Sequence, residues 1–295
     1  MEIDSDIIIV GGGLNGSLLA IAAAKIGFST IVLDSKGNHR DELNSFDGRS
    51  YALAASSVRL LKNLDIFEDI RGCSQPILDI EILDGKLVQG PSQFSLHFDN
   101  NEIHDGPMGY MVEDRFIRKT LFAQILATNQ IDYKFDSKVT EHYQQGGYIS
   151  VQLDNGQKLR TRLVVGADGR NSNIAKRAKI KKSGWRYKQN ALVCAIEHEI
   201  DHKGLAWQYF LPNGPLAILP MTGNRSSIVW TEQTKNADAI NVLDDNQYME
   251  ILNSRLGGFL GKCKLIGSRH SFPLELRIAD RFIDDRLALI GDAAH

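Results

Sequence analysis

The first part of the chain constrains the fold more than any other stretch. Asp6–Val10 is a short β-branched run that predicts a buried parallel strand, and it leads directly into the glycine turn Gly11–Gly16. Leu14–Ile26 carries apolar residues at helical spacing and ends at Gly27, where a C-terminal cap belongs. A second β-branched strand then ends at Asp34. This strand–turn–helix–strand order predicts an α/β fold that begins with a Rossmann-like unit.

Each glycine of the Gly11-x-Gly13-x-x-Gly16 pattern has a physical reason. Gly11 allows the tight turn, Gly13 lets the backbone approach a pyrophosphate, and Gly16 lets the helix pack on the sheet. The phosphates would lie against free amides at the positive end of the helix dipole. Asp34 would accept hydrogen bonds from the adenosine ribose. A glycine-rich turn without a ligand is the alternative, but the flanking elements and the spacing of Asp34 favour dinucleotide binding.

Two further glycine–acid turns follow strand-like runs. Leu163–Val165 enters Gly166-Ala-Asp168-Gly169, and Leu287–Ile290 enters Gly291-Asp292-Ala-Ala-His295. Taken singly, each aspartate predicts a helix N-cap rather than a ligand. Their order after the first glycine turn, each directly behind a buried-looking strand, favours a shared site instead.

The remaining patterns predict two domains. The first would span residues 1–182, with a β-meander at about 140–162, and the chain would return to it at 283–295. A β-sheet domain, inserted into the first, would occupy residues 183–282. The elements expected between the glycine turns are amphipathic helices at 50–69 and 114–128, a strand at 77–83, and in the second domain strands at 191–197, 207–211, 216–219, 227–231 and 264–272 with a helix at 245–256.

Composition excludes several functions. The 34 Lys and Arg nearly balance the 36 Asp and Glu, whereas nucleic-acid binding needs a clustered basic excess. The densest basic stretch, Lys176–Lys182, lacks interleaved aromatic residues and predicts a solvated face. The 3 cysteines form no CxxC pair, which argues against disulfides and thiolate zinc sites. The acidic N-terminus and the lack of a long apolar run predict a cytoplasmic protein.

One competing motif is His198-Glu-Ile-Asp-His202, which matches the HExxH pattern of zinc proteases. That chemistry needs both imidazoles on one helical face, but Ala191–Glu197 before the motif is β-like and Lys203-Gly204 after it is a turn signal. We therefore expect two histidines on a solvated strand end and no metal site. Gly257–Gly261 follows a helix rather than a strand and predicts a loop.

Taken together, the three glycine turns resemble those of the class A flavin-dependent aromatic hydroxylases, which bind FAD. Finer motifs resemble the ubiquinone-biosynthesis hydroxylases within that class. The stretches that carry this second resemblance are Asp47–Leu53, Gly109–Glu113, Phe210–Pro220, Ser226–Thr231 and Phe272–Leu274.

The resemblance implies a Rossmann-like FAD-binding domain of the p-hydroxybenzoate-hydroxylase (GR2) type, with an inserted antiparallel-sheet substrate domain. NAD(P)H would reduce the flavin, O₂ would form a C4a-hydroperoxide, and one oxygen atom would be transferred to the ring of a polyprenylated phenol. The strands from Trp207 to Trp230 would form much of the substrate wall. Other ubiquinone-biosynthesis proteins are implied as partners, with peripheral contact at the inner face of the membrane.

Carried over position by position, the resemblance assigns FAD contacts to the three turns and to Arg49. The first turn and Asp34 would hold the pyrophosphate and the adenosine ribose, and Arg49 would lie at the flavin side of the pyrophosphate. Asp168 would support FAD and the passing NAD(P)H, and Asp292 the ribitol or phosphate region. No catalytic residue and no metal ligand is assigned. The full implied set is Gly11, Gly13, Gly16, Asp34, Arg49, Asp168, Gly169, Gly291 and Asp292.

Two other functions share these features. Another FAD-dependent oxidoreductase of the same fold would carry every fingerprint, and a non-catalytic partner subunit would keep the fold without FAD. Members of the family continue past the Gly291–His295 segment, so the sequence is expected to be truncated at its C-terminus.

Overall fold

The structure is a computed structural model that describes residues 3–37, 43–86, 90–102 and 106–295. The chain forms two compact units. Unit 1 contains Met1–Leu43, Arg118–Trp185 and Glu275–His295, and unit 2 contains Asn44–Ile117 and Arg186–Leu274. The sequence-based boundaries placed residues 44–117 in the first domain. They belong to unit 2 because their strand β5 (Asp79–Lys86) pairs in parallel with β13 (Leu205–Leu211).

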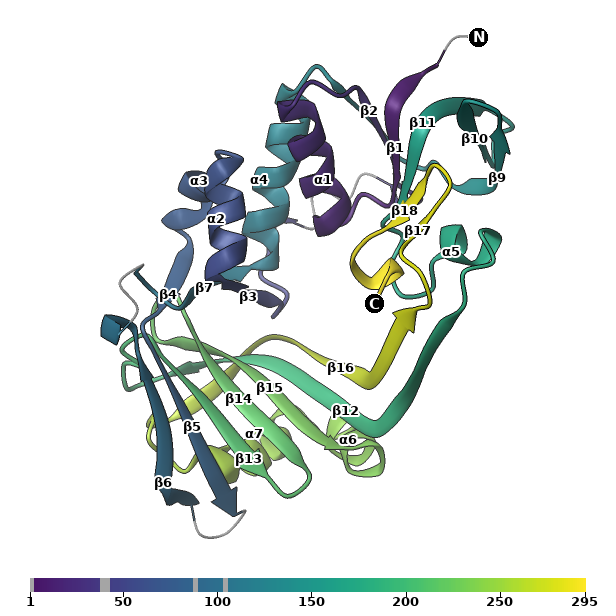
Figure 1. Ribbon diagram of the computed structural model, residues 1–295. Helices are drawn as coiled ribbons and strands as arrows, with labels where there is room; N and C mark the ends of the chain where they lie inside the picture. Colours follow the sequence, from purple (N-terminus) through teal and green to yellow (C-terminus); the bar gives the residue numbers. More distant parts are fainter. Residues whose placement is uncertain (1–2, 38–42, 87–89, 103–105) are drawn as a thin grey trace. The chain divides into compact units, whose positions relative to one another are not determined.

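The sheet of unit 1 is built around parallel strands (Figure 1). Parallel pairing means that consecutive strands end at the same edge of the sheet, so the turns that leave them meet there. The predicted meander is confirmed, since β9 and β10 add to β11 in antiparallel fashion. The strands are, in sheet order, β17 (Ile283–Asp284), β18 (Leu287–Leu289), β11 (Lys158–Gly166), β1 (Ser5–Val10), β2 (Thr30–Leu33) and β8 (Ile131–Lys134), with β10 (Tyr148–Leu153) and β9 (Val139–Gln145) beside β11.

Small residues let a helix approach this sheet closely. Helix α1 (Leu14–Lys25) buries Ala20, Ala23 and Ala24, which contribute no side chain beyond Cβ. Helix α4 (Asp114–Ala127), which matches the helix expected at 114–128, enters unit 1 at Arg118, and the short α5 (Asn173–Arg177) follows β11. The hydrophobic core of unit 1 consists mainly of isoleucine, valine and leucine side chains, which include Ile8 and Val10 of β1.

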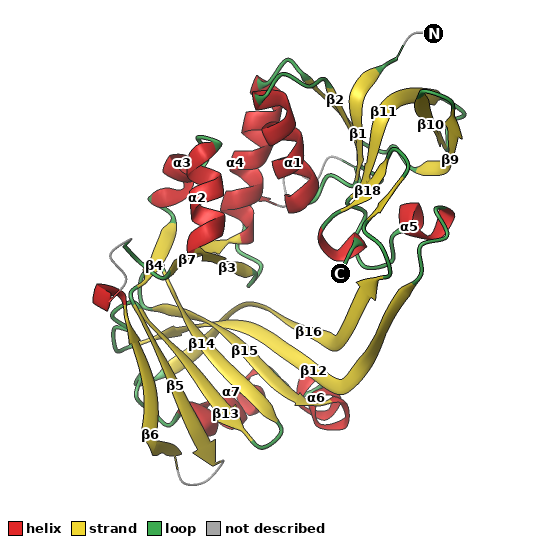
Figure 2. Ribbon diagram, in the orientation of Figure 1, coloured by secondary structure: helices red, strands yellow, loops and turns green. Residues whose placement is uncertain are grey.

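Unit 2 contains a large, mainly antiparallel sheet, a smaller sheet and helices (Figure 2). The large sheet has the order β16 (Cys263–Ala279), β12 (Lys182–His198), β15 (Arg225–Gln233), β14 (Gly214–Met221), β13, β5 and β6 (Gly90–Asp99). The first residues of β12 and the last of β16 fall in unit 1. The small sheet has the order β3 (Ser50–Ala54), β7 (Gly109–Glu113) and β4 (Ser74–Ile77). The helices described in this unit include α2 (Ala55–Asn63), α3 (Phe67–Arg71), η2 (Asn100–Glu102), α6 (Thr234–Asn241) and α7 (Asp245–Leu256).

The helical pattern expected at 50–69 was wrong at its start. Ser50–Ala54 forms β3, which pairs along its length with β7, and α2 begins only at Ala55. Tertiary pairing overrides the amphipathic spacing here, because every residue of this short run has a partner on β7. The strands and the helix expected between residues 191 and 272 are confirmed, although β16 runs further than expected and α6 was not anticipated.

One face of the large sheet in unit 2 is covered by α6 and α7. Trp230 is fully buried there and packs against Tyr248 of α7. Its neighbour Glu232 is also buried and accepts hydrogen bonds from the Trp230 Nε1 and from Arg255. Trp230 therefore belongs to a closed core, and the expectation that it lines a substrate wall was wrong for this side chain.

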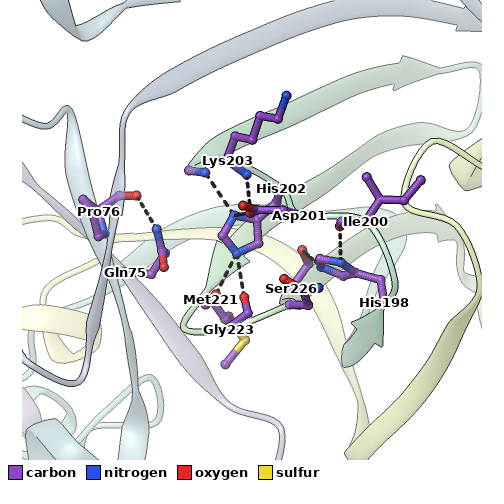
Figure 3. Close-up of polar contacts among 12 residues, drawn as sticks. Gln75, Pro76, His198, Ile200, Asp201, His202, Lys203, Met221, Gly223 and Ser226 are labelled. Atoms are coloured by element: carbon purple, nitrogen blue, oxygen red, sulfur yellow. Dashed lines mark hydrogen bonds and ion pairs between the residues drawn. The ribbon is translucent and has the colours of Figure 1, made fainter.

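The HExxH histidines are buried rather than solvated, so that expectation was also wrong (Figure 3). His198 Nδ1 donates to Ile200 O at 2.8 Å, and its Nε2 lies 2.9 Å from Ser226 Oγ. His202 Nδ1 accepts from Gly204 N, and its Nε2 donates toward Met221 O at 2.8 Å. Every ring nitrogen of the pair is thus engaged with protein atoms. The turn after β12 brings the two rings to 5.7 Å in an edge-on contact.

Burial lowers the pKa of His198 from its ordinary value of 6.5. His198 therefore takes up a proton at a higher pH in the unfolded chain than in the folded chain. As the pH falls through the ordinary value of 6.5, the unfolded chain binds more protons, so protonation favours unfolding. We expect the free energy of unfolding to fall between pH 7.5 and pH 5.5, and the fall to be smaller in His198→Asn, which keeps a donor for Ile200 O. Denaturant unfolding at both pH values measures the difference.

Candidate functional site

The first glycine turn follows β1 at the edge where the parallel strands end. Gly11 has a φ of +109°, and a Cβ on it would lie 2.4 Å from Ala167 O. A Cβ on Gly16 would lie 1.9 Å from Gly11 O. The roles predicted for these two glycines, a tight turn and close packing of the helix on the strand, agree with this geometry.

Gly13 differs from its neighbours. It is the N-cap residue of α1, has an ordinary φ of −68°, and has nothing within 4 Å of the Cβ that it lacks. Neither backbone conformation nor protein packing requires glycine at this position. Open space in front of a helix N-terminus is what a pyrophosphate would need.

Gly12 was not singled out from the sequence. A Cβ here would lie 1.8 Å from the hydroxyl oxygen of Tyr133 and 2.6 Å from Asp34 Oδ2. Tyr133 comes from β8, at the far end of the sheet from β11, and no sequence motif pointed to it. Only the parallel pairing of β8 with β2, in which Val32 lies opposite Tyr133, brings the ring to the turn.

Asp34 follows β2 and lies beside the glycine turn, as predicted. Its Oδ1 accepts from Lys36 N at 3.0 Å and its Oδ2 from the Tyr133 hydroxyl at 2.9 Å. The side chain is half-buried and borders two adjoining hollows. Its carboxylate is therefore held in place beside the open space in front of Gly13.

The larger hollow has a volume of about 490 Å³, within the range of small-molecule sites. It lies between the first two glycine turns, and both Asp34 and Asp168 line it. The smaller hollow, of about 120 Å³, adjoins it and is lined largely by apolar and aromatic groups. The cationic side chains that line the larger hollow are Lys36, Arg118, Lys138 and Arg177.

The carboxylate of Asp168 caps the first amides of α5, although the N-cap residue of that helix is Ser172, whose Oγ accepts from a backbone amide of the same helix. Asp168 Oδ2 accepts from the backbone N–H of Asn173 at 2.7 Å and of Ile174 at 3.2 Å, at the start of α5. Gly169 has a φ of +80°, which allows the turn between them. Asp168 Oδ1 is buried and has no hydrogen-bond partner among the described residues. Since buried polar atoms are rarely left unpaired, this oxygen fits a donor on a ligand.

The third turn is tied to the other two. Gly291 has a φ of +56°, and a Cβ there would lie 2.1 Å from Asn15 Nδ2 in the first turn. Ile290 N donates to Gly166 O, at the start of the second turn. Asp292 itself is exposed, and its backbone carbonyl accepts from Lys182 Nζ at 2.9 Å. The structure thus brings the three predicted turns together at one edge of the sheet.

Lys182 was expected on a solvated face, but it has a structural role. Its ammonium donates to Arg170 O as well as to Asp292 O, and so joins the second and third turns. Burial lowers the pKa of Lys182, although the carboxylates of Asp168 and Asp292 oppose the shift. The expectation of full solvation was wrong for this residue.

Arg49 belongs to unit 2, and the structure describes its surroundings there. Its Nε donates to Asp47 Oδ2 at 2.6 Å, and its Nη2 lies 3.2 Å from Asp114 Oδ2. The hydrogen bond with Asp47 raises the pKa of Arg49, so the guanidinium stays charged. Tyr51 donates to the other oxygen of Asp114 at 2.7 Å. Arg49 is therefore held within unit 2 by one carboxylate just before β3 and one at the start of α4.

The residues of unit 1 fit an FAD dinucleotide. The glycine turn offers open space at a helix N-terminus, and cationic side chains line the larger hollow. Asp168 Oδ1, which has no hydrogen-bond partner among the described residues, could accept from the ligand. Arg177, which lines the same hollow, has a buried Nη1 without a hydrogen-bond partner among the described residues. An anionic ligand with hydroxyl groups would satisfy both atoms.

Gly13 and Gly16 should respond differently to the same change. Gly13→Ala should cost at most about 1 kcal/mol of stability, because alanine is a poorer helix N-cap than glycine. It should weaken FAD binding by about tenfold or more, because its methyl group enters only the ligand's space. Gly16→Ala should lower both the free energy of unfolding and the affinity for FAD. About 1–3 kcal/mol of stability should be lost, because the new methyl group is overpacked against Gly11 O. Denaturant unfolding and a titration with FAD measure the two effects. Unchanged FAD affinity in Gly13→Ala would contradict the assignment.

Two relatives match almost the whole of this chain. Ubiquinone hydroxylase UbiL of Rhodospirillum rubrum is 40% identical over 291 residues, which are 99% of this chain and 66% of that protein. The 3-demethoxyubiquinol 3-hydroxylase of Escherichia coli is 28% identical over 99% of this chain and 73% of that protein. The chain thus spans about two thirds to three quarters of the length of these two relatives.

Solved structures share the fold. The p-nitrophenol 4-monooxygenase PnpA of Pseudomonas putida has a TM-score of 0.79 at 18% identity, over 100% of this chain and 74% of that one. Aklavinone-11 hydroxylase, in a complex with FAD and aklavinone, has a TM-score of 0.76 at 18% identity, over 100% of this chain and 58% of that one. The predicted fold class, a Rossmann-like unit combined with a mainly antiparallel sheet, is confirmed. The model of the FAD binding domain family matches residues 4–295, so the chain belongs to that family and its cofactor is FAD.

Proposed function

We propose that this protein is an FAD-dependent monooxygenase that hydroxylates the aromatic ring of a polyprenylated phenol in ubiquinone biosynthesis. The observation that carries the proposal is the meeting of the three glycine turns at one sheet edge, in a chain of the FAD binding domain family. The names of the relatives from R. rubrum and E. coli support the ring hydroxylation and the pathway. NAD(P)H and O₂ are the proposed co-substrates.

Unit 1 is proposed to hold the cofactor. Gly11, Gly13 and Gly16 would admit the pyrophosphate, Asp34 would accept from the adenosine ribose, and the cations of the larger hollow would balance the phosphate charge. The proposed set also includes Asp168 with Gly169, and Gly291 with Asp292. Arg49, held by Asp47 and Asp114 in unit 2, is proposed to contact the flavin side of the pyrophosphate.

The bound flavin would supply the activation of O₂, and the protein would position the substrate and exclude water. In the overall reaction a ring C–H and O₂ give C–OH and water, while NAD(P)H and a proton supply two electrons and two hydrogens. Unit 2 is proposed to bind the substrate. Because Trp230 and its face of the large sheet are closed by α6 and α7, we assign this role to the opposite face, where Val193, Ala217 and Val229 are paired neighbours.

A titration with FAD tests the cofactor site first. After incubation with FAD and desalting, the protein should keep the two visible absorption bands of oxidised flavin, whereas Asp34→Ala should keep less. With NAD(P)H, a polyprenylated phenol and isotopically heavy O₂, mass spectrometry should then find one heavy oxygen atom in the product. Oxidation of NAD(P)H without incorporation of heavy oxygen into the phenol would indicate another FAD-dependent oxidoreductase. A colourless protein would indicate a non-catalytic subunit.

A polyprenylated substrate would be dissolved in a bilayer, so the proposal includes peripheral contact with the inner face of the membrane. No helix in the described ranges is long and apolar enough to cross a membrane. We expect part of the protein to sediment with liposomes that contain the substrate, and less with bare liposomes. A protein that stays entirely in the supernatant in both cases would contradict membrane contact while leaving the proposed chemistry in place.

A further inference from the structure

We infer that Tyr133 is a positioning residue that holds the Asp34 carboxylate toward the ribose of the dinucleotide, and that Tyr133, rather than the ligand, requires the glycine at position 12. The inference rests on the proposed cofactor site and extends it to a residue outside every glycine turn. Tyr133 would act through Asp34 and would not itself touch the reacting atoms.

Among the described residues, each oxygen of the Asp34 carboxylate has one protein donor. Lys36 N–H donates to Oδ1 at 3.0 Å, and the Tyr133 hydroxyl donates to Oδ2 at 2.9 Å. Donors on both oxygens fix the rotation of the carboxylate about its Cβ–Cγ bond. Each oxygen of a carboxylate has a second lone pair, so both remain able to accept from a ribose hydroxyl. Without the tyrosine, Lys36 N would be the one donor left to the carboxylate among the residues that the structure describes.

The tyrosine ring is itself fixed. Its centroid lies 4.6 Å from that of Phe135 and 5.8 Å from that of Phe122 on α4. Parallel pairing of β8 with β2 places Tyr133 opposite Val32, two residues before Asp34. The hydroxyl therefore reaches the carboxylate from a rigid strand and a packed aromatic cluster, which is the kind of support that a precise contact needs.

The same hydroxyl explains Gly12. It lies 3.3 Å from Gly12 O, and a Cβ on Gly12 would come within 1.8 Å of it. Gly12 is not among the glycines with a positive φ, so its backbone conformation would suit other residues. Position 12 is a free position in the GxGxxG pattern. The requirement for glycine here thus arises from the tyrosine and Asp34.

Protonation of Tyr133 is also assured. Burial, together with the negative charge of Asp34, raises the pKa of Tyr133. The hydroxyl consequently keeps its proton over the physiological pH range and serves as a donor to the carboxylate. A donor to an ionised acceptor makes one of the stronger classes of hydrogen bond.

The test compares two ligands in the whole chain. Affinity is measured, by quenching of flavin fluorescence, for FAD and for the FAD analogue whose adenosine ribose lacks the 2′-hydroxyl. The wild type should prefer FAD by about tenfold, as expected for a hydrogen bond to a charged group. Tyr133→Phe should lower that preference by about threefold, because the ring and its packing remain while the orientation of Asp34 is lost.

The controls separate positioning from a structural effect. Tyr148→Phe loses a hydroxyl contact with Gln145 in the same unit, remote from the glycine turn, and should keep the wild-type preference. In an Asp34→Ala background, adding Tyr133→Phe should cause no further change in preference, because the tyrosine acts through the carboxylate.

Two results would overturn the inference. One is equal weakening for both ligands in Tyr133→Phe, with the preference unchanged, which would indicate a structural role alone. The other is a further change in preference when Tyr133→Phe is added to Asp34→Ala. That result would mean that Tyr133 acts on the ligand directly. If the wild type binds neither ligand, the proposed function fails and the inference with it, whereas FAD binding with an unaltered preference in Tyr133→Phe rejects the inference alone.

Discussion

Parallel strand pairing is the constraint on which the site depends. Because β18, β11, β1, β2 and β8 pair in parallel, the loops that follow them leave from one edge of the sheet. Backbone contacts then fix these loops against one another: Ala167 N donates to Val10 O, and Ile290 N donates to Gly166 O. A side chain at position 11 would collide with Ala167 O of the second turn, and one at position 16 with Gly11 O, so both positions require glycine.

In each unit, charged side chains hold neighbouring segments in place. Lys182 joins the second and third turns through their carbonyls, so the connection does not depend on neutralising a nearby carboxylate. In unit 2, buried Glu113 is contacted by Arg115 at 2.7 Å and by Arg225 at 2.8 Å, one on each oxygen. Asp114, its neighbour, contacts Arg49. Paired in this way, buried charges hold a guanidinium in a defined place at less cost than an unpaired charge would have.

Much of unit 1 could be predicted because its signals are local. The strand–turn–helix–strand run, the meander and the three glycine turns are each read from consecutive residues, and the structure contains them all. The errors arose where local signals are ambiguous or where burial depends on distant residues. Ser50–Ala54 fits both a helix and a half-buried strand, and pairing with β7 decided the matter. His198 and His202 look polar in sequence, yet the sheet and the following turn bury them.

The sequence by itself determined the type of fold, the three glycine turns and the place of Asp34, because each depends on backbone conformation and on spacing along the chain. Only the tertiary structure decided that Tyr133 holds Asp34 and occupies the space beside Gly12, and that Lys182 joins two turns. It also decided that residues 44–117 pair with the second unit. These contacts join residues far apart in sequence, so strand order and register must be known before their side chains can be placed together.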